Sequence, residues 1–234
     1  LGLRTTVLER GPWLLRRQLD ARAADLLRTY LTNLGLDVQL EAESAQLLGD
    51  ERLERVVLRD GREVPADVLL MAAGIVPATE LAAAAGLAVA RGVVVDSRLR
   101  TSDPDIFAVG DLVDWEGSVL GLWPVAVEQA EVAAENAVGG DRAYGGTIPV
   151  TMLKVVGVEL SSIGRIEADA SAGERAHVVE DAEALRYRKL VTDADDRCIG
   201  AILLGHPDEA AAVIAAVKAR SPSEAALPPA LAPA

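Results

Sequence analysis

Cysteine, aromatic side chains and long apolar runs are scarce in this chain of 234 residues, and each shortage excludes a class of protein. The single cysteine, Cys198, excludes a disulfide framework, a cysteine-rich metal site and a cysteine-pair redox centre within the chain. With one Phe, three Tyr and three Trp, the core has to be built from Ala, Val and Leu. No apolar run is long enough to span a bilayer, and the first residues show no signal-peptide pattern. We therefore expect a cytoplasmic protein with no membrane association.

Basic residues are also few, because 23 Lys and Arg stand against 36 Asp and Glu and give a net charge of −13. This balance argues against nucleic acid or an anionic membrane surface as a partner. The length allows one large domain or two small ones. The oligomeric state is not indicated.

Side chains that perform catalysis on their own are missing as well. Neither His177 nor His206 has a partner for a catalytic pair, and Ser161 and Ser162 have no neighbouring His/Asp arrangement. No spacing of metal ligands occurs. The sequence therefore predicts no catalytic residue and no metal site, and any redox chemistry has to come from a cofactor.

Residues 1–76 show the element order of a small doubly wound nucleotide-binding domain. Thr5–Glu9 is rich in β-branched residues and predicts a strand, as does Asp37–Leu40. A helix is predicted between them, ending at Gly35, because apolar residues recur at helical spacing at Leu19, Ala23, Leu26, Tyr30 and Leu34.

Two further features complete this first segment. Val56–Leu58 followed by Asp60-Gly61 predicts a hairpin, because Asp-Gly suits a type I′ turn. Asp67–Met71 predicts another buried strand, which leads into a turn at Gly74 and Pro77. The order β-α-β, hairpin and β is that of an α/β fold with a parallel sheet.

Residues 77–145 form a second segment. It contains a short Ala-rich helix closed by Gly86, an apolar strand at Val93–Val95, and a helix from Trp123 to about Val138 that is stopped by two glycines. Pro124 stands at the first turn of that helix, where proline is favoured.

From Thr147 onward short strands predict a separate α+β domain over residues 146–220. The expected strands are Leu153–Val156, Val178–Glu180, Leu185–Val191 and Ile199–Leu204, followed by a helix over about Pro207–Ala219. The tail, residues 221–234, is rich in Ser, Pro and Ala, has little to bury, and is expected to be disordered.

The stretch Thr101–Asp111 is the most specific pattern in the chain. Asp103-Pro104 predicts a turn, and Ile106–Val109 a short buried parallel strand. Gly110 allows a ligand to approach the backbone, and Asp111 would lie just past the carboxyl end of the strand, where a carboxylate can accept hydrogen bonds from sugar hydroxyls. The alternative is that Gly-Asp merely ends a strand.

Two other places are candidate nucleotide contacts. Glu9 ends a strand where an acid can bind the ribose 2′-OH of NAD and repel a 2′-phosphate, which favours NADH over NADPH. Glu128, Gln129 and Ala130 lie one turn into the Trp123 helix, whose N-terminus carries partial positive charge. An exposed acid at a strand end and an ordinary packed helix are the alternatives.

Taken together, these motifs resemble the FAD-dependent pyridine-nucleotide reductase family. The resemblance rests on Val7–Arg10, Ala72–Pro77, Thr101–Asp111, Gly121–Ala130 and Thr151–Gly164. It is nearest to the flavin-bearing part of NAD(P)H nitrite reductase large subunits and to NADH:rubredoxin reductases. The implied fold is a partial Rossmann-like NAD(P)-binding domain, the second half of an FAD-binding domain, and a small α+β C-terminal domain.

The resemblance also implies roles for single residues. Gly110 and Asp111 would hold the ribityl–phosphate part of FAD, whereas Glu128–Ala130 and Lys154 would lie near the isoalloxazine. Glu9 and Gly74 would serve NAD(P)H. A hydride would pass from NADH to FAD, and the electrons would leave to a protein or metal-centre acceptor, such as rubredoxin or a nitrite reductase centre.

One part of the family pattern is missing. No Gly-x-Gly-x-x-Gly loop occurs in the 234 residues, although the pyrophosphate of each nucleotide would normally rest on such a loop. The sequence is thus interpreted as the C-terminal portion of a reductase with weak or no FAD binding. The competing hypothesis is a non-catalytic remnant that serves as a binding or assembly module.

A basic patch is the remaining candidate feature. Arg186 and Arg188, with Arg175 and Lys189, could dock a small acidic electron carrier. The alternative is a solvated edge strand guarded by charge.

Overall fold

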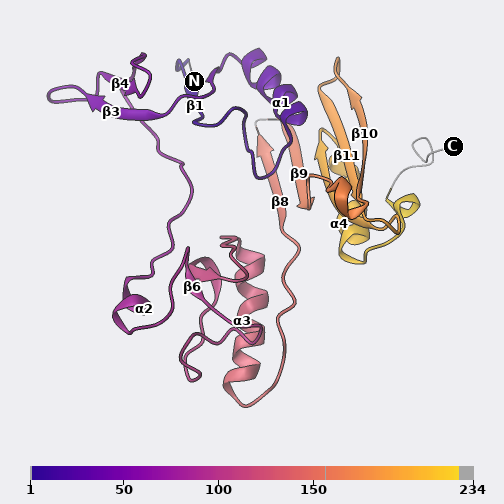
Figure 1. Cartoon of the computed structure of the whole chain (residues 1–234). Helices are drawn as coiled ribbons and strands as arrows, with labels where there is room; N and C mark the ends of the chain where they lie inside the picture. Colours follow the sequence, from indigo (N-terminus) through magenta and orange to yellow (C-terminus); the bar gives the residue numbers. More distant parts are fainter. Residues whose placement is uncertain (1, 156, 227–234) are drawn as a thin grey trace. The chain divides into compact units, whose positions relative to one another are not determined.

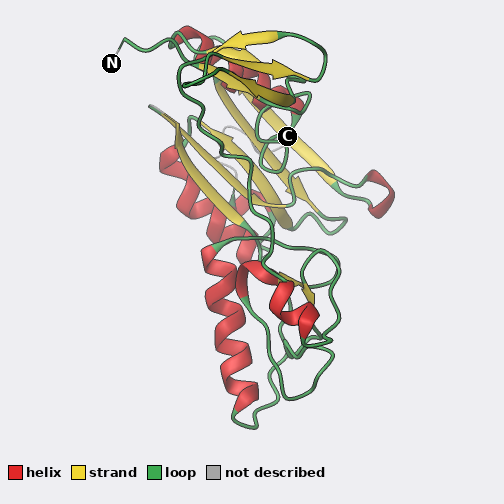
Figure 2. Ribbon diagram, turned by 90° about the vertical axis from the view of Figure 1, so that its left-hand side faces the viewer, coloured by secondary structure: helices red, strands yellow, loops and turns green. Residues whose placement is uncertain are grey.

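The computed structural model describes residues 2–155 and 157–226, and it has the mixed α/β architecture that the sequence predicts (Figures 1 and 2). Its contacts divide the chain into two compact units, one of Leu1–Leu70 with Val150–Ala234 and one of Met71–Pro149. None of the described helices is long and apolar enough to cross a membrane.

The first unit begins with the predicted β-α-β order. Strands β1 (Thr6–Leu8) and β2 (Asp37–Gln39) pair in parallel, and helix α1 (Ala21–Asn33) connects them. Asp20 caps α1 by accepting a hydrogen bond from the Ala23 N–H at 2.9 Å. Gly35, with φ of +86°, ends the helix turn as expected.

A three-stranded antiparallel sheet follows, made of β3 (Ser44–Leu48), β4 (Arg55–Leu58) and β5 (Glu63–Pro65). The hairpin predicted at Asp60-Gly61 joins β4 to β5 and is confirmed. The strand predicted at Asp67–Met71 is wrong. These residues form no strand, and Val68 and Leu70 are more than four-fifths exposed, because no described strand pairs with them.

The C-terminal part of the first unit is a five-stranded antiparallel sheet in the order β10-β11-β12-β9-β8. Its strands are β8 (Val150–Val155), β9 (Val158–Gly164), β10 (Arg175–Asp181), β11 (Arg186–Thr192) and β12 (Cys198–Leu204), followed by helix α4 (Pro207–Lys218). Strand β9 was not predicted.

The tail is ordered further than expected. Ser223 is 1% exposed and donates a hydrogen bond to Asp196, and a short 3-10 turn spans Ser223–Ala225. The expectation of disorder is therefore wrong for the start of the tail, while residues 227–234 lie outside the described residues.

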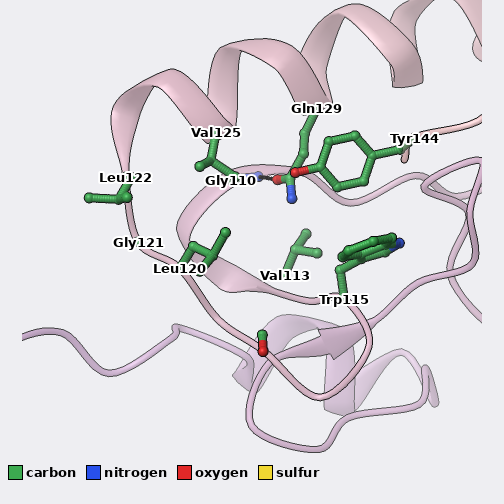
Figure 3. A pocket seen from close by; sticks show the side chains of 10 residues that line it. Gly110, Val113, Trp115, Leu120, Gly121, Leu122, Val125, Gln129 and Tyr144 are labelled. Atoms are coloured by element: carbon green, nitrogen blue, oxygen red, sulfur yellow. Dashed lines mark hydrogen bonds between the residues drawn. The ribbon is translucent and has the colours of Figure 1, made fainter. Parts of the chain in front are cut away.

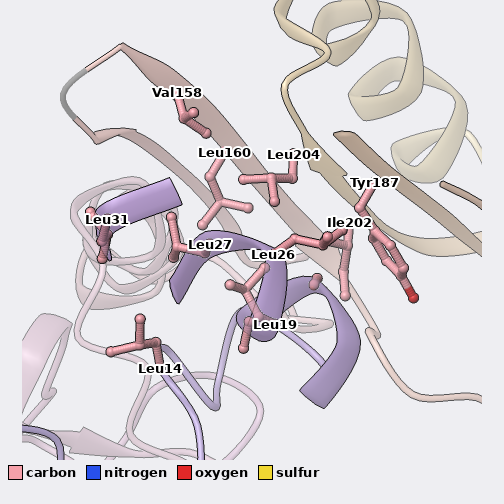
Figure 4. Packing of buried hydrophobic residues seen from close by; sticks show 12 residues of the cluster. Leu14, Leu19, Leu26, Leu27, Leu31, Val158, Leu160, Tyr187, Ile202 and Leu204 are labelled. Carbon is pink, nitrogen blue, oxygen red and sulfur yellow. The ribbon is translucent and has the colours of Figure 1, made fainter. Parts of the chain in front are cut away.

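One hydrophobic core joins the beginning and the end of the sequence. Leu26, Leu27 and Leu31 of α1 pack with residues of β9, β11 and β12, among them Leu160 and Ile202 (Figure 4). The first and third predicted segments thus share a core. The assignment of residues 1–76, 77–145 and 146–220 to separate functional domains stays a prediction.

A buried polar cluster accompanies this core. The Asp20 carboxylate accepts hydrogen bonds from the Tyr187 hydroxyl at 2.7 Å and from Lys189 Nζ at 2.9 Å. Lys189 also donates to Glu167 at 3.0 Å. Burial opposes the charge on Asp20, but the bonds from the Ala23 N–H, Tyr187 and Lys189 outweigh it and leave the pKa of this carboxyl below its ordinary value.

The second unit holds α2 (Glu80–Ala84), the parallel pair β6 (Val93–Val94) and β7 (Val113–Asp114), and α3 (Trp123–Ala137). The strand predicted at Ile106–Val109 is wrong. Ile106 and Ala108 bond instead to Thr101 and Leu99, so this stretch folds back antiparallel as a tight loop. The parallel pairing begins after the Gly-Asp step.

We predict that Asp20→Asn destabilises the chain by about 1–3 kcal/mol at neutral pH, because Lys189 loses a buried charged partner while the cap is kept. A carboxylate with a lowered folded pKa stabilises above the unfolded pKa of about 4 and loses this contribution as the pH falls through the folded pKa. The difference from the parent chain should therefore shrink below about pH 4 in urea unfolding. Asp25→Asn, on the exposed side of α1, is the control and should change stability by less than about 0.5 kcal/mol.

Candidate functional site

The second unit places Gly110 against the first turns of α3 (Figure 3). Gly110 has φ of +82°, a conformation that favours glycine. Its N–H donates a hydrogen bond of 2.7 Å to the side-chain oxygen of Gln129, which is 4% exposed. The structure therefore brings together Gly110 and Gln129, two of the residues predicted to contact the flavin, and a direct hydrogen bond joins them.

A small cavity lies beside this bond. Its lining residues come from the Gly110 turn, the loop after β7, the start of α3 and Tyr144, and they include Trp115, Leu120, Val125 and Gln129 (Figure 3). Trp115 and Tyr144 meet edge to face, with ring centroids 5.0 Å apart. The space open to the centre of a water molecule is about 20 Å³, which is the room of one water.

Asp111 lies in the 3-10 turn Gly110–Leu112, is exposed, and does not line this cavity. The expectation that it follows a parallel strand at Ile106–Val109 is wrong, because that stretch is a loop. The buried acid nearby is Asp114 in β7, which is 4% exposed and accepts a hydrogen bond from the Arg91 N–H at 3.2 Å. The contact of Asp111 with a flavin stays a prediction.

Glu128 takes part in a chain of hydrogen bonds that the sequence did not predict. Thr147 donates to the Glu128 carboxylate at 2.7 Å, and the Tyr144 hydroxyl lies 2.7 Å from the Thr147 hydroxyl. No local motif marks Thr147 or Tyr144, because these contacts join residues on opposite sides of the Gly139-Gly140 turn. Ala130, the third predicted residue of this turn, is exposed.

The N-terminus of α3 has no side-chain cap, and Pro124 stands in its first turn as predicted. The helix therefore presents uncapped N–H groups near Gly110, as the electrostatic interpretation of this helix requires. Trp123, the first residue, is 82% exposed.

The other predicted cofactor residues are spread over both units. In the first unit, Glu9 follows β1 and its carboxylate accepts a hydrogen bond from the Gly11 N–H at 2.6 Å. Lys154 on β8 is 85% exposed and pairs with Glu159 at 3.2 Å. Gly74, in the second unit, lies in an exposed loop with φ of +89° and open space around it.

The basic patch is not confirmed. Arg188 is 9% exposed and Lys189 is 5% exposed, because β11 is an interior strand of the five-stranded sheet. Arg188 pairs with Glu209, and Lys189 pairs with Asp20 and Glu167. The edge-strand alternative is also wrong for these residues, since the edge is formed by β10.

His206 and Cys198 both lie in partly or fully buried positions within the fold. His206 stands before α4 and contacts Glu209 at 3.1 Å, while burial and the nearby Arg188 lower the pKa of its imidazole. Cys198 is fully buried in β12, and burial raises the pKa of its sulfhydryl. Within the described ranges, no cluster of three or more metal-ligating side chains was found.

Comparison with known proteins supports the resemblance seen in the sequence. Residues 1–130 match the family model of pyridine nucleotide-disulphide oxidoreductases, and residues 149–221 match the rubredoxin NAD+ reductase C-terminal domain. A nitrite reductase [NAD(P)H] of Bacillus subtilis (strain 168) is 36% identical over 210 residues, which are 89% of this chain and 26% of that protein.

Two further matches agree. The ferredoxin–NAD(+) reductase component of the biphenyl dioxygenase system of Paraburkholderia xenovorans (strain LB400) is 37% identical over 71% of this chain and 42% of that protein. The crystal structure of a FAD-dependent pyridine nucleotide-disulphide oxidoreductase from Desulfovibrio vulgaris is 27% identical, with a TM-score of 0.77 over 95% of this chain and 60% of that one. The chain thus spans about a quarter to three-fifths of these relatives.

We predict that Gln129→Met destabilises the second unit by about 1–3 kcal/mol, because the Gly110 N–H is left without its acceptor. Urea unfolding followed by the fluorescence of Trp115, with Trp13 and Trp123 replaced by Phe, measures this change. Glu131→Met, an exposed position on α3, is the matched control and should shift stability by less than about 0.5 kcal/mol. Equal losses in both variants would contradict the role given to the Gly110–Gln129 bond.

Proposed function

Because the chain belongs to the pyridine nucleotide-disulphide oxidoreductase family, we propose that it is part of an NAD(P)H-dependent FAD oxidoreductase. In this function a hydride passes from NADH to FAD, and the electrons then leave to a protein or metal-centre acceptor. The observation that carries the proposal is the succession of the two matches, 1–130 and 149–221, in one chain. FAD and NAD(P)H are the cofactors of this family.

We infer that the described residues hold FAD weakly on their own. The cavity beside Gly110 has room for one water, and the Gly110 N–H is already bonded to Gln129. No Gly-x-Gly-x-x-Gly loop occurs in the sequence to hold a pyrophosphate. The flavin contacts of Gly110, Asp111, Glu128–Ala130 and Lys154 stay predictions from the resemblance.

The nucleotide side of the proposal rests on Glu9. This acid lies at the carboxyl end of a parallel strand, where open α/β sheets bind their ligands. The Gly11 N–H holds its carboxylate by one oxygen, which leaves the second for a ribose hydroxyl. This arrangement supports NADH as the reductant, and the contact of Gly74 with the nucleotide stays a prediction from the resemblance.

The acceptor is proposed from the relatives. Their names include a ferredoxin reductase component and a nitrite reductase, and the C-terminal segment matches a rubredoxin reductase domain. We therefore favour a small electron-carrier protein or a nitrite reductase centre. The second candidate function, a non-catalytic binding or assembly module, is favoured by the water-sized cavity beside Gly110.

We predict that the purified chain binds FAD with a dissociation constant weaker than about 100 μM, since the pyrophosphate has no loop to rest on. Absorbance and flavin-fluorescence titration measures this. A yellow protein that is bleached by NADH would contradict this prediction and would show that the chain alone carries the flavin chemistry. A chain that stays colourless with added FAD would agree with this prediction, and NADH binding through Glu9 would then distinguish an incomplete reductase from the non-catalytic module.

A second prediction addresses NADH. Replacing Glu9 by Gln should weaken NADH binding about fivefold and leave NADPH binding equal or stronger, because the carboxylate that accepts from the ribose and repels a 2′-phosphate is lost. Isothermal titration calorimetry with both nucleotides is the measurement. Glu41→Gln, an exposed acid of the same unit, is the control. The same response to both nucleotides would remove Glu9 from the site.

A further inference from the structure

The edge strand β10 begins with a basic residue and ends with an acidic one, so two antiparallel copies of it would place opposite charges against each other. Its sequence is Arg-Ala-His-Val-Val-Glu-Asp over Arg175–Asp181, and one of its sides pairs with β11. The other side has no strand next to it among the described residues, as Figure 1 shows. A free strand edge is a template for pairing with another strand.

We propose that β10 pairs antiparallel with β10 of a second copy of this chain, about a two-fold axis at Val178. In this register Arg175 faces Asp181 of the other copy, and Asp181 faces its Arg175. Val178 faces its own counterpart. In this register odd-numbered residues face odd-numbered ones, and even-numbered residues face even-numbered ones. The backbone N–H and C=O groups that point away from β11 therefore face each other across the two copies and form roughly six to eight hydrogen bonds.

The charges of β10 support this register over others. Arg175 and Asp181 form no ion pair within the described part of the chain, and six residues of extended strand keep them from reaching each other. A parallel arrangement in register would bring Arg175 against Arg175 and Asp181 against Asp181, which is destabilising. Antiparallel pairing turns both ends into opposite-charge pairs.

The exposed apolar residues at the centre of β10 also support this pairing. Val178 is 50% exposed and Val179 is 40% exposed, one on each face of the strand. In the proposed register Val178 packs on Val178, and Val179 packs beside His177 of the other copy, so part of this apolar surface is buried. The alternative is that these charges only prevent another strand from pairing with the edge. That role requires neither apolar residues between the charges nor opposite signs at the two ends of the strand.

The other edge of the sheet lacks these features. Strand β8 carries one charged residue, Lys154, which pairs with Glu159 of β9. A reversed copy of β8 would place Lys154 opposite Thr151 and gain no ion pair. The pattern therefore selects β10, and an interface of one seven-residue strand per copy predicts a weak dimer.

Sedimentation velocity of the full chain at physiological ionic strength tests the proposal, because the repulsion between copies of charge −13 is then largely screened. We expect a concentration-dependent shift from 24.5 kDa toward twice that mass. Arg175→Glu and Asp181→Arg, each alone, should weaken dimerisation about tenfold, since each creates two like-charge pairs. The double variant should restore it. A monomeric parent chain, or a double variant no better than the singles, would overturn the proposal.

A cross-linking experiment gives a second measurement that does not depend on charge. Val178→Cys lies on the proposed two-fold axis and should be linked to its counterpart by a short bismaleimide. Ala176→Cys, also exposed on β10, would be about 14 Å from its counterpart and is the matched control. The native Cys198 is buried and should not react. Equal linking at both positions would contradict the register.

Discussion

The carboxylate of Asp20 connects parts of the chain that are 167 and 169 residues apart in sequence, and the first unit depends on it. It caps α1 and at the same time accepts bonds from Tyr187 and Lys189 on β11. A lysine in an interior strand is costly to bury without a carboxylate partner. The position of α1 on the five-stranded sheet is therefore tied to a charge balance as well as to apolar packing.

The second unit relies on a comparable but uncharged bond. Gln129 of α3 binds the Gly110 N–H, so a helix and a glycine turn that would both belong to a flavin site hold each other. The same bond occupies the backbone group that a ligand would otherwise use. The cavity beside this bond has room for only one water.

Local chemistry explains what could be predicted from the sequence. The helix face ending at Gly35, the Asp60-Gly61 hairpin, the start of the Trp123 helix and the strand holding Cys198 all depend on residues close together in the chain. Strands 67–71 and 106–109 were predicted from apolar composition, and both failed, because a strand also needs a neighbour to accept its hydrogen bonds. Composition shows that a segment suits burial, but it does not supply the partner.

The same reasoning separates the basic residues of the C-terminal sheet. Alternation along Arg186–Lys189 could not show that β11 is interior, because strand order is a non-local property. Once the order is known, Arg188 and Lys189 become buried ion-pair members, whereas Arg175 and Asp181 of the edge strand β10 form no ion pair in the described part of the chain. Strand order thus decides which charges neutralise the interior of the sheet and which can meet another molecule.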